Sequence, residues 1–197
     1  RVEARSFRFL HVSSCFPRKG IDALLEAYGA AFTIDDDVSL IIKTFDNPHN
    51  EVRAMLADLQ ARHPQYPHVV TIFGDISDAE LKALYAQCHV MVGPSFAEGY
   101  GLPFAEAMLS GIPVITTNWG GQLDFCNAGN SWLVDYRFER AASHLGVRSS
   151  AWARVEVQAL VTAMRTARET GPETRAAMAA RGRKQLLTRH KWTDVAR

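Results

Sequence analysis

The chain has 197 residues, of which 47% are hydrophobic, 10% aromatic and 22% charged. This composition is typical of a soluble globular domain and excludes a disordered or collagen-like chain. The length is sufficient for one large domain with a full core. No apolar stretch approaches the roughly 18 residues of a membrane-spanning helix, and no signal peptide is visible. Because the sequence begins at Arg1 and enters a strand-like run almost at once, we expect an excised piece of a longer protein.

The formal net charge of +1 conceals two regions of opposite charge. Residues 1–136 carry nine basic and sixteen acidic side chains, whereas residues 137–197 carry thirteen basic and five acidic ones. Two interpretations of the basic region stay open: attraction to an anionic membrane or polyanionic substrate, or a solvated helix surface. Its cations include Arg175, Arg181, Arg183, Lys184, Arg189 and Lys191.

The three cysteines, Cys15, Cys88 and Cys126, lie far apart in the sequence and form no C-x-x-C pair. Neither a disulfide framework nor a zinc site is therefore indicated. A reduced, cytoplasmic compartment agrees with this use of cysteine.

Short apolar runs alternate with segments of helical periodicity along the chain. Buried strands are predicted at residues 7–14, 39–45, 69–73, 89–93, 113–117 and 132–136. Helices are predicted at residues 21–32, at 50–62, after the capping box that starts at Ser77, at about 102–110, and twice from about residue 155 onwards. Residues 137–153 are the least regular stretch, and we expect a surface loop or insertion there.

Strands that are apolar throughout and alternate with helices predict an α/β fold, with a parallel sheet covered by helices on both faces. The connections are short and no internal repeat is present, so residues 1–197 are predicted to form a single domain. In such a sheet ligands bind beyond the carboxyl ends of the strands, and the strand-to-helix turns are where chemistry is expected.

The first strand is followed by the turn SSCFPRKG, which ends at Gly20. Lys19 stands just before the next helix, where a cation beside free backbone N–H groups suits a phosphate or diphosphate. Neither G-x-G-x-x-G nor a P-loop motif is present, so a dehydrogenase-type dinucleotide fold and a P-loop nucleotidase are disfavoured. The alternative is that Arg18 and Lys19 are a solvated basic pair.

The second turn, Pro94–Glu106 (PSFAEGYGLPFAE), carries the most chemical information. Gly99 and Gly101 permit a close approach of the backbone, and Pro103 is tolerated in the first turn of a helix. The N–H groups of residues 100–102 would then point out of the helix start and form a cradle for an anion.

Two carboxylates, Glu98 in the loop and Glu106 in the helix, flank this cradle. Carboxylates suit sugar hydroxyls, which donate hydrogen bonds to them, and do not suit phosphate. For Glu106 the alternative is a helix residue that complements the helix dipole.

A third turn, Thr116–Asp124 (TTNWGGQLD), follows the strand at residues 113–117. Gly120 and Gly121 open a predicted short helix and can bring backbone amides close to a ligand. Three such turns at one edge of a sheet indicate that their residues belong to one ligand-binding site.

The run PSFAEGYGLPFAEAMLSGIPVI, from Pro94 to Ile115, resembles the hallmark of glycosyltransferase family four, in which seven residues separate two Glu. FGDISDAELKALYAQCHVMVGPS before it, TNWGGQLDF after it and HKWTDVA near the end resemble other parts of that family. The resemblance runs from about Phe9 to Asp135. It implies a Rossmann-like parallel sheet that forms the C-terminal, nucleotide-sugar-binding half of a GT-B fold. It also implies that the N-terminal acceptor domain is absent from this chain.

The resemblance assigns roles to the matching residues. Lys19 would neutralise the donor diphosphate, and Glu98 would hold hydroxyls of the transferred sugar, so these two form the catalytic set. The donor-binding set is Ser14, Arg18, Phe73, Gly74, Gly99, Tyr100, Gly101, Leu102, Glu106, Gly120 and Gly121.

Within the donor-binding set, the backbone N–H groups of residues 100–102 would serve the diphosphate and the sugar. Glu106 would take the ribose hydroxyls. Residues 73–74 would contact the base, largely through the backbone, and residues 120–121 would line the sugar side.

Two departures from the family pattern are visible. The family usually has Gly-Arg, and hence a second cation on the diphosphate, where this chain has Ser13 and Ser14. Arg18 or the Ser14 hydroxyl would compensate, or the donor affinity is lower than usual. Asp124 stands where the family commonly has Glu.

The family resemblance implies a retaining hexosyl transfer without a metal ion or another cofactor. The donor would be a UDP-, GDP- or ADP-linked sugar and the acceptor a glycan or lipid-linked molecule, with no nucleic-acid partner. The isolated piece is expected to bind its donor weakly and to transfer nothing. A non-catalytic nucleotide-sugar-binding module and a GT-B epimerase or phosphorylase stay open as alternatives. The expected location is cytoplasmic, with peripheral membrane contact as an open interpretation.

Overall fold

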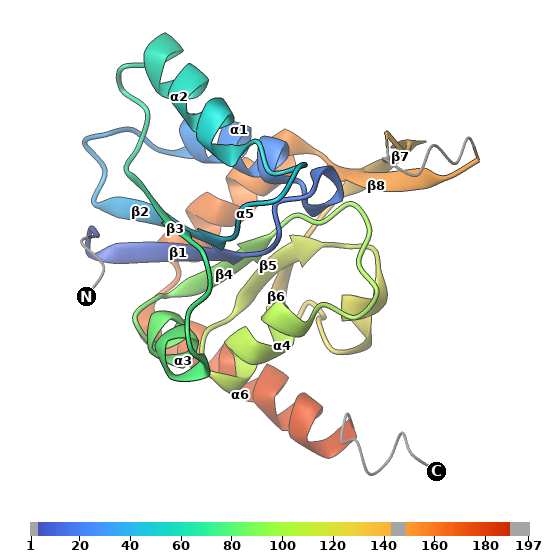
Figure 1. The fold of residues 1–197 in the computed structure, drawn as a ribbon. Helices are drawn as coiled ribbons and strands as arrows, with labels where there is room; N and C mark the ends of the chain where they lie inside the picture. The colour runs from blue at the N-terminus through green and yellow to red at the C-terminus, as the bar shows by residue number, and fades with distance from the viewer. Residues whose placement is uncertain (1–3, 143–148, 190–197) are drawn as a thin grey trace.

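A computed structural model describes residues 4–142 and 149–189 of the chain. Six parallel strands form one sheet in the order β3-β2-β1-β4-β5-β6 (Figure 1). The strands are β1 (Phe7–Val12), β2 (Val38–Thr44), β3 (Val69–Phe73), β4 (Val90–Gly93), β5 (Val114–Thr117) and β6 (Ser131–Val134). The predicted parallel α/β sheet is confirmed.

Helices cover both faces of this sheet, as predicted (Figure 1). One face carries α1 (Ile21–Ala31), α2 (Val52–Arg62) and α5 (Val157–Glu169), and the other carries α3 (Asp78–Ala86), α4 (Leu102–Leu109) and α6 (Pro172–Arg189). Successive strand residues point to opposite faces, so Phe9 and Leu40 join the first core whereas Leu10 and Ile41 join the second. The capping box predicted for the α3 start is confirmed, with Ser77 and Glu80 bonded to each other's backbone N–H groups.

Helix α6 packs on α4 and exposes most of its cations. Gly182 is buried against Met108, and a Cβ at that position would lie 2.4 Å from the methionine sulfur. Arg183, Lys184 and Arg189 are exposed, in agreement with the solvated-surface interpretation of the basic region. Lys191 and the HKWTDVA segment lie outside the described residues. None of the helices in the described part is long and apolar enough to cross a membrane.

The loop or insertion predicted at residues 137–153 is in part a β-hairpin, and that prediction was wrong. Strands β7 (Tyr136–Arg140) and β8 (Ala151–Val155) pair antiparallel, and residues 143–148 between them are not described. Trp152 and Ala153 are buried against the body of the domain. Aromatic and charged residues do alternate in YRFER, but no turn signal such as Asn-Gly marks the hairpin.

The strand order reverses between β1 and β4. From β1 the chain moves outward through β2 to β3, and from β4 it moves the other way through β5 to β6. Such a reversal leaves a crevice at the carboxyl ends of the two central strands, because the following helices lie on opposite faces. The turns after β1 and β4 therefore meet at the position where this fold class binds its ligands.

Candidate functional site

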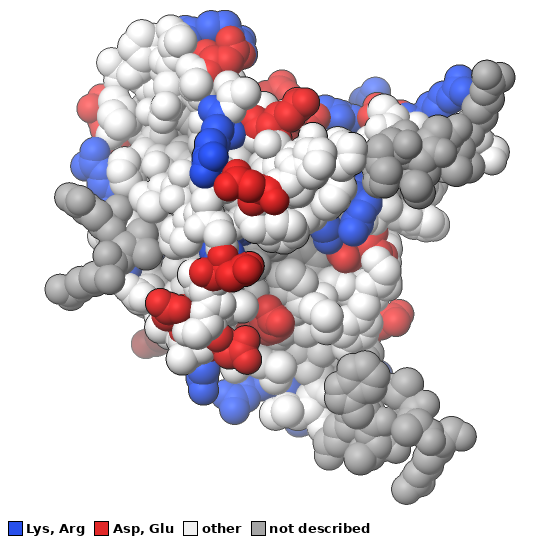
Figure 2. Space-filling model, viewed as in Figure 1, with Lys and Arg blue, Asp and Glu red and all other residues white. Residues whose placement is uncertain are grey.

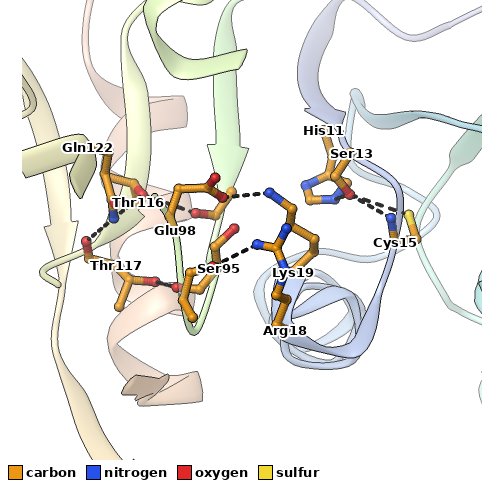
Figure 3. A network of polar contacts seen from close by, with 12 residues as sticks. His11, Ser13, Cys15, Arg18, Lys19, Ser95, Glu98, Thr116, Thr117 and Gln122 are labelled. Carbon is orange, nitrogen blue, oxygen red and sulfur yellow. Dashed lines mark hydrogen bonds and ion pairs between the residues drawn. The ribbon is translucent and has the colours of Figure 1, made fainter. Parts of the chain in front are cut away.

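An ion pair joins the turns that follow β1 and β4. Lys19 ends a short 3₁₀ helix, η1 (Pro17–Lys19), after β1, and Glu98 lies in the loop after β4. Lys19 Nζ lies 2.6 Å from Glu98 Oε2, and the two side chains are only 12% and 11% exposed. Figure 3 shows them pointing toward one another from the two facing turns. The sequence placed both residues in the site but gave no indication that they pair.

The turn after β1 lies directly against the loop after β4. Gly20 has φ +68°, and a Cβ at this position would lie 2.2 Å from the Pro94 carbonyl oxygen, so a side chain would force the two apart. The Phe96 N–H donates to the Arg18 carbonyl at 2.7 Å, and the Arg18 guanidinium donates to the Ala97 carbonyl at 2.8 Å. Arg18, a candidate second cation for the diphosphate, is thus held beside the Glu98 loop (Figure 3).

The Gly-Gly turn supports the Glu98 loop from the other side. The Gly121 N–H donates to the Glu98 carbonyl at 3.0 Å. A Cβ on Gly121 would lie 1.7 Å from the Gly99 carbonyl oxygen, a distance that only glycine allows. The Thr117 hydroxyl donates to the Ser95 carbonyl at 2.6 Å (Figure 3). Residues 120–121 therefore set the position of the loop, in addition to any contact with a ligand.

The unpredicted hairpin is a third support for this loop. The Ala153 N–H donates to the Phe96 carbonyl at 2.9 Å, and the Trp152 ring packs on the Phe96 ring with centroids 5.9 Å apart. The Arg154 guanidinium lies 4.9 Å from the centre of the Phe96 ring and pairs with Asp22 of α1 at 2.6 Å. The hairpin thus connects α1 to the base of the loop that holds Glu98.

Helix α4 begins at the end of this loop without a side-chain cap. Its N-cap is Gly101, at φ +86°, and Pro103 occupies the first turn as predicted. The N–H groups of Gly101 and Leu102 have no hydrogen-bond partner among residues 4–142 and 149–189. Unpaired N–H groups at a helix start carry partial positive charge and bind anions. Tyr100 lies just before them, its ring centroid 5.1 Å from that of Phe125.

A buried histidine organises the start of the β1 turn. His11 Nδ1 lies 2.9 Å from the Val92 carbonyl oxygen and Nε2 lies 2.7 Å from the Ser13 hydroxyl. Since a carbonyl only accepts, Nδ1 carries the proton and Nε2 accepts from Ser13. Burial lowers the pKa of His11 to about 4, and the nearby Lys19 cation adds to this effect. The imidazole is therefore neutral at pH 7.

The two serines that replace the family's Gly-Arg have different environments. The Ser13 hydroxyl contacts His11 and also accepts from the Cys15 N–H at 3.0 Å, so it is used within the turn (Figure 3). The Ser14 carbonyl accepts from the Asn47 amide at 2.8 Å, and its side chain is half-buried. Neither position supplies a second cation.

Glu106 lies one turn into α4, exposed and oriented by a tyrosine. The Tyr85 hydroxyl donates to Glu106 Oε2 at 3.0 Å and lies 3.2 Å from the Pro103 carbonyl oxygen. Burial and the Glu106 carboxylate raise the pKa of Tyr85, so its hydroxyl keeps its proton. The sequence indicated Tyr85 only as an inward-facing residue of α3, and its role toward Glu106 was missed.

Phe73 and Gly74, the predicted base contacts, lie at the sheet edge beyond β2 and apart from the ion pair. The Arg53 guanidinium lies 3.6 Å from the centre of the Phe73 ring. The Gly74 carbonyl accepts from the ammonium of Lys43, a buried residue of β2, at 2.7 Å. Lys43 was missed, although a lysine inside the apolar run SLIIKTF was a usable signal.

Acidic side chains run down the middle of the face shown in Figure 2. A cavity of about 10 Å³ is lined by both members of the pair and by residues that include His11 and Phe104, and its volume is at the lower limit for one water molecule. Two hollows of about 450 and 360 Å³ lie between α1 and α2, and neither is lined by Lys19, by Glu98 or by the start of α4. Within the three turns, Lys19, Arg18 and the α4 start are the groups that offer positive charge to an anion at the β1–β4 crevice.

The structure brings most of the predicted site residues together. Lys19, Arg18, Glu98, Gly99, Tyr100, Gly101, Leu102, Gly120 and Gly121 belong to three turns that contact one another. Ser14 borders them, Glu106 lies on the adjoining helix, and residues 73–74 lie two strands away from β1. Fold and site together define a class of protein: a Rossmann-like domain that gathers a cation, helix N–H groups and carboxylates at the carboxyl ends of its strands.

Comparison with known proteins identifies the family within this class. Residues 2–146 match the family described as glycosyl transferases group 1, and the chain belongs to this family. It is 34% identical over 108 residues to MMP alpha-(1->4)-mannosyltransferase of Mycolicibacterium hassiacum, covering 55% of this chain and 25% of that protein. It is 33% identical over 110 residues to O-antigen chain mannosyltransferase B of Escherichia coli, covering 55% and 28%. The match thus spans less than a third of the length of these relatives.

Solved structures confirm the fold. The C-terminal domain of a glycosyl transferase group 1 family protein, LpcC, from Francisella tularensis superposes with a TM-score of 0.74 at 18% identity, covering 96% of this chain and 88% of that one. Sucrose-phosphate synthase from Thermosynechococcus elongatus gives 0.76 at 23% identity, covering 99% and 44%. Anabaena HepE in complex with UDP and glucose gives 0.73 at 21% identity, covering 97% and 46%. The chain is therefore a C-terminal GT-B domain, as the sequence predicted.

Proposed function

We propose that this chain is the donor-binding domain of a retaining, metal-independent glycosyltransferase. The observation that carries the proposal is the Lys19–Glu98 pair in front of the α4 start, because it places a cation and a carboxylate 2.6 Å apart at the crevice of the sheet. A nucleoside diphosphate sugar needs both: positive charge for the diphosphate and a hydrogen-bond acceptor for the sugar hydroxyls.

The proposed chemistry concerns the bond between the anomeric carbon and the diphosphate. As this bond breaks, positive charge develops on the sugar ring and negative charge on the leaving diphosphate. The Lys19 ammonium and the N–H groups of Gly101 and Leu102 stabilise the leaving group. Since the cavity that the pair lines holds at most one water, a diphosphate cannot enter it, and we propose that the diphosphate binds in front of the α4 start and draws Lys19 away from Glu98. Glu98 then becomes available to the sugar hydroxyls.

The named relatives support a hexose donor. Two of them are mannosyltransferases, one of O-antigen chains, and a structural neighbour was solved with UDP and glucose. We therefore propose a glycan or lipid-linked acceptor, bound by a domain outside this chain, and a role in polysaccharide biosynthesis. Since the acceptor would bind elsewhere, this chain alone is proposed to bind a donor but not to transfer its sugar.

Titration calorimetry of this chain with UDP, GDP and ADP and their sugars tests donor binding. Binding of at least one nucleotide with a dissociation constant up to the millimolar range is expected, weakened by Lys19→Ala and unchanged by Lys82→Ala on the exposed side of α3. No heat with any nucleotide would contradict the proposal.

The chemical details need the complete enzyme and an acceptor. Retention predicts that the anomeric configuration of the donor is kept in the product, as read by proton NMR of the newly formed linkage. Metal independence predicts full activity after exhaustive treatment with EDTA. An inverted product or an EDTA-sensitive rate would overturn the corresponding part of the proposal.

Peripheral membrane contact is proposed through the exposed cations of α6. Arg183, Lys184 and Arg189 face solvent, and juxtaposed cations attract anionic lipid headgroups. Flotation with vesicles of phosphatidylglycerol is expected at low salt and lost at high salt, whereas no flotation at low salt would contradict this contact.

A further inference from the structure

Lys43 carries a buried positive charge that the proposed mechanism does not use. It is the second-last residue of β2 and only 8% exposed. Its ammonium donates to the Gly74 carbonyl at 2.7 Å and the Thr44 carbonyl at 3.2 Å. No carboxylate of the described residues lies within ion-pair distance of it, in contrast to Lys19. Burying an ammonium without a counter-ion is costly, so a purely structural role would be served at lower cost by an apolar side chain.

The ammonium retains donor capacity toward a ligand. An ammonium has three N–H donors, and two of them are used by the carbonyls of Gly74 and Thr44. The third has no acceptor in the part of the chain that the structure describes. The ammonium lies next to Gly74, which has φ +88° and, apart from its two chain neighbours, no heavy atom within 4 Å of the position that a Cβ would take. A buried donor without an acceptor in the described residues thus lies at the carboxyl end of the sheet, beside a residue whose Cβ direction is open.

This space is at the end of the site where the base of a nucleotide is expected. The ion pair and the α4 start occupy the β1–β4 crevice, Glu106 lies beside them, and β2 and β3 continue the same edge of the sheet. A nucleotide whose diphosphate lies at α4 and whose ribose reaches Glu106 therefore directs its base toward the ends of β2 and β3. The Arg53 guanidinium over the Phe73 ring, 3.6 Å from its centre, borders this end.

We propose that Lys43 selects a nucleobase with an exocyclic carbonyl oxygen, and this inference rests on the proposed function. The third N–H of its ammonium donates to O4 of uracil or O6 of guanine. Cytosine and adenine carry an amino group at the corresponding position, which is a donor and opposes the ammonium. The nucleotide of the donor is therefore UDP or GDP, and not CDP or ADP.

Two matched pairs of nucleotides isolate this contact. UDP and CDP differ at the C4 substituent and in the proton on N3, and GDP and ADP differ at the C6 substituent, in the proton on N1 and at the guanine amino group, so the loss of preference in a Lys43 variant identifies the contact. For whichever pair binds, titration calorimetry of the wild-type chain is expected to show at least tenfold tighter binding of the carbonyl-bearing member. In Lys43→Met this preference falls to less than threefold, because the affinity for UDP or GDP drops and that for CDP or ADP does not. Lys43→Arg, which keeps the donors, retains a preference.

Other results overturn the inference in distinguishable ways. Equal weakening of all four nucleotides by Lys43→Met shows that Lys43 only holds the end of β3 in place. If Lys43→Met does not fold, the wild-type chain still decides, since equal affinity within both pairs contradicts base selection. No binding of any nucleotide overturns the proposed function as well. Lys82→Met, which removes an exposed cation from α3, is the control and is expected to leave all four affinities unchanged.

Discussion

Two lysines lie at the carboxyl edge of the sheet, one in each half of that edge, and they have different kinds of partner. At the ends of β1 and β4, Lys19 is paired with a carboxylate, and glycine contacts, the Gly-Gly turn and the hairpin surround the pair. At the ends of β2 and β3, Lys43 is more buried but is held by two backbone carbonyls.

This difference in partners determines how each of the two cations could interact with a ligand. In the proposed mechanism, Lys19 exchanges Glu98 for a phosphate oxygen when the diphosphate binds, and it contributes most as negative charge develops on the leaving diphosphate. Lys43 needs no exchange, because one of its donors is unused in the described part of the chain. We therefore propose that the β1–β4 half serves the chemical step and that the β2–β3 half recognises the base.

The largest expected effect is the loss of activity when the Lys19 ammonium is removed from the β1–β4 half. In the enzyme that contains this domain, Lys19→Ala is expected to lower kcat by about 30- to 1000-fold, since the loss of a donor to a developing negative charge costs about 2–4 kcal/mol. Steady-state kinetics with varied donor measures this, and Lys82→Ala is the matched control. Near-normal turnover of Lys19→Ala would remove Lys19 from the mechanism.

Protonation of His11 is expected to destabilise the turn after β1, which belongs to the same half of the site. Its pKa is lowered from 6.5 to about 4 by burial, so the unfolded chain binds this proton more readily than the folded one. The contribution of His11 to stability is therefore complete above pH 6.5 and is lost as the pH falls from about 6.5 to about 4. The loss amounts to about 3 kcal/mol, because one pKa unit corresponds to about 1.4 kcal/mol.

Urea unfolding between pH 7 and pH 4 measures this loss. His11→Asn is expected to show a shallower dependence on pH over the same range, whatever its stability at pH 7. NMR titration of the His11 ring in the wild-type chain supplies a second reading, and a pKa near 6.5 would contradict the account.

A methyl group added at Gly121 is expected to push the Glu98 loop away from the Gly-Gly turn that supports it. Gly121→Ala places a Cβ 1.7 Å from the Gly99 carbonyl oxygen, so the backbone must move. We expect a loss of about 1–3 kcal/mol in the free energy of unfolding, together with weaker nucleotide binding. Gly171→Ala, where a Cβ meets nothing within 4 Å, is the control and is expected to change stability by less than about 1 kcal/mol. Equal stabilities of the two variants would contradict the proposed support.

Removal of the hydrogen bond between Tyr85 and Glu106 has the smallest expected effect, and it tests whether Glu106 contacts the ribose. Tyr85→Phe removes the hydroxyl that orients Glu106, at a cost of about 1 kcal/mol, or roughly fivefold in nucleotide affinity. If Glu106 binds the ribose, the effect disappears with a 2′,3′-dideoxynucleotide. An equal loss with both nucleotides would indicate that Tyr85 acts only on stability.

The strand-to-helix turns could be predicted because their chemistry is local. Lys19 before Gly20, and Glu98 before Gly99 and Gly101, are visible in the sequence as short patterns next to apolar runs. The ion pair could not be predicted, since it joins turns 79 residues apart and depends on the contact of Gly20 with the Pro94 carbonyl.

Two residues whose contacts could not be predicted, His11 and Lys43, have a different property in common. His11 and Lys43 are polar residues within apolar strands, which marks them as unusual, but their partners include the Val92 carbonyl of the neighbouring strand β4 and the Gly74 carbonyl just after β3. Strand order and register decide such contacts, and periodicity does not reveal them. The hairpin was missed because the alternation in YRFER is short and no turn motif accompanies it.

The most direct test of the account is the place where a nucleotide diphosphate binds. Titration of the ¹⁵N-labelled chain with UDP and with GDP, followed by amide chemical shifts, reports that place residue by residue. The account predicts that the amides of Gly101 and Leu102 shift most with at least one of the two nucleotides, and that Lys19→Ala reduces their response. Shifts confined to the hollow between α1 and α2, or none with either nucleotide at millimolar concentration, would contradict it.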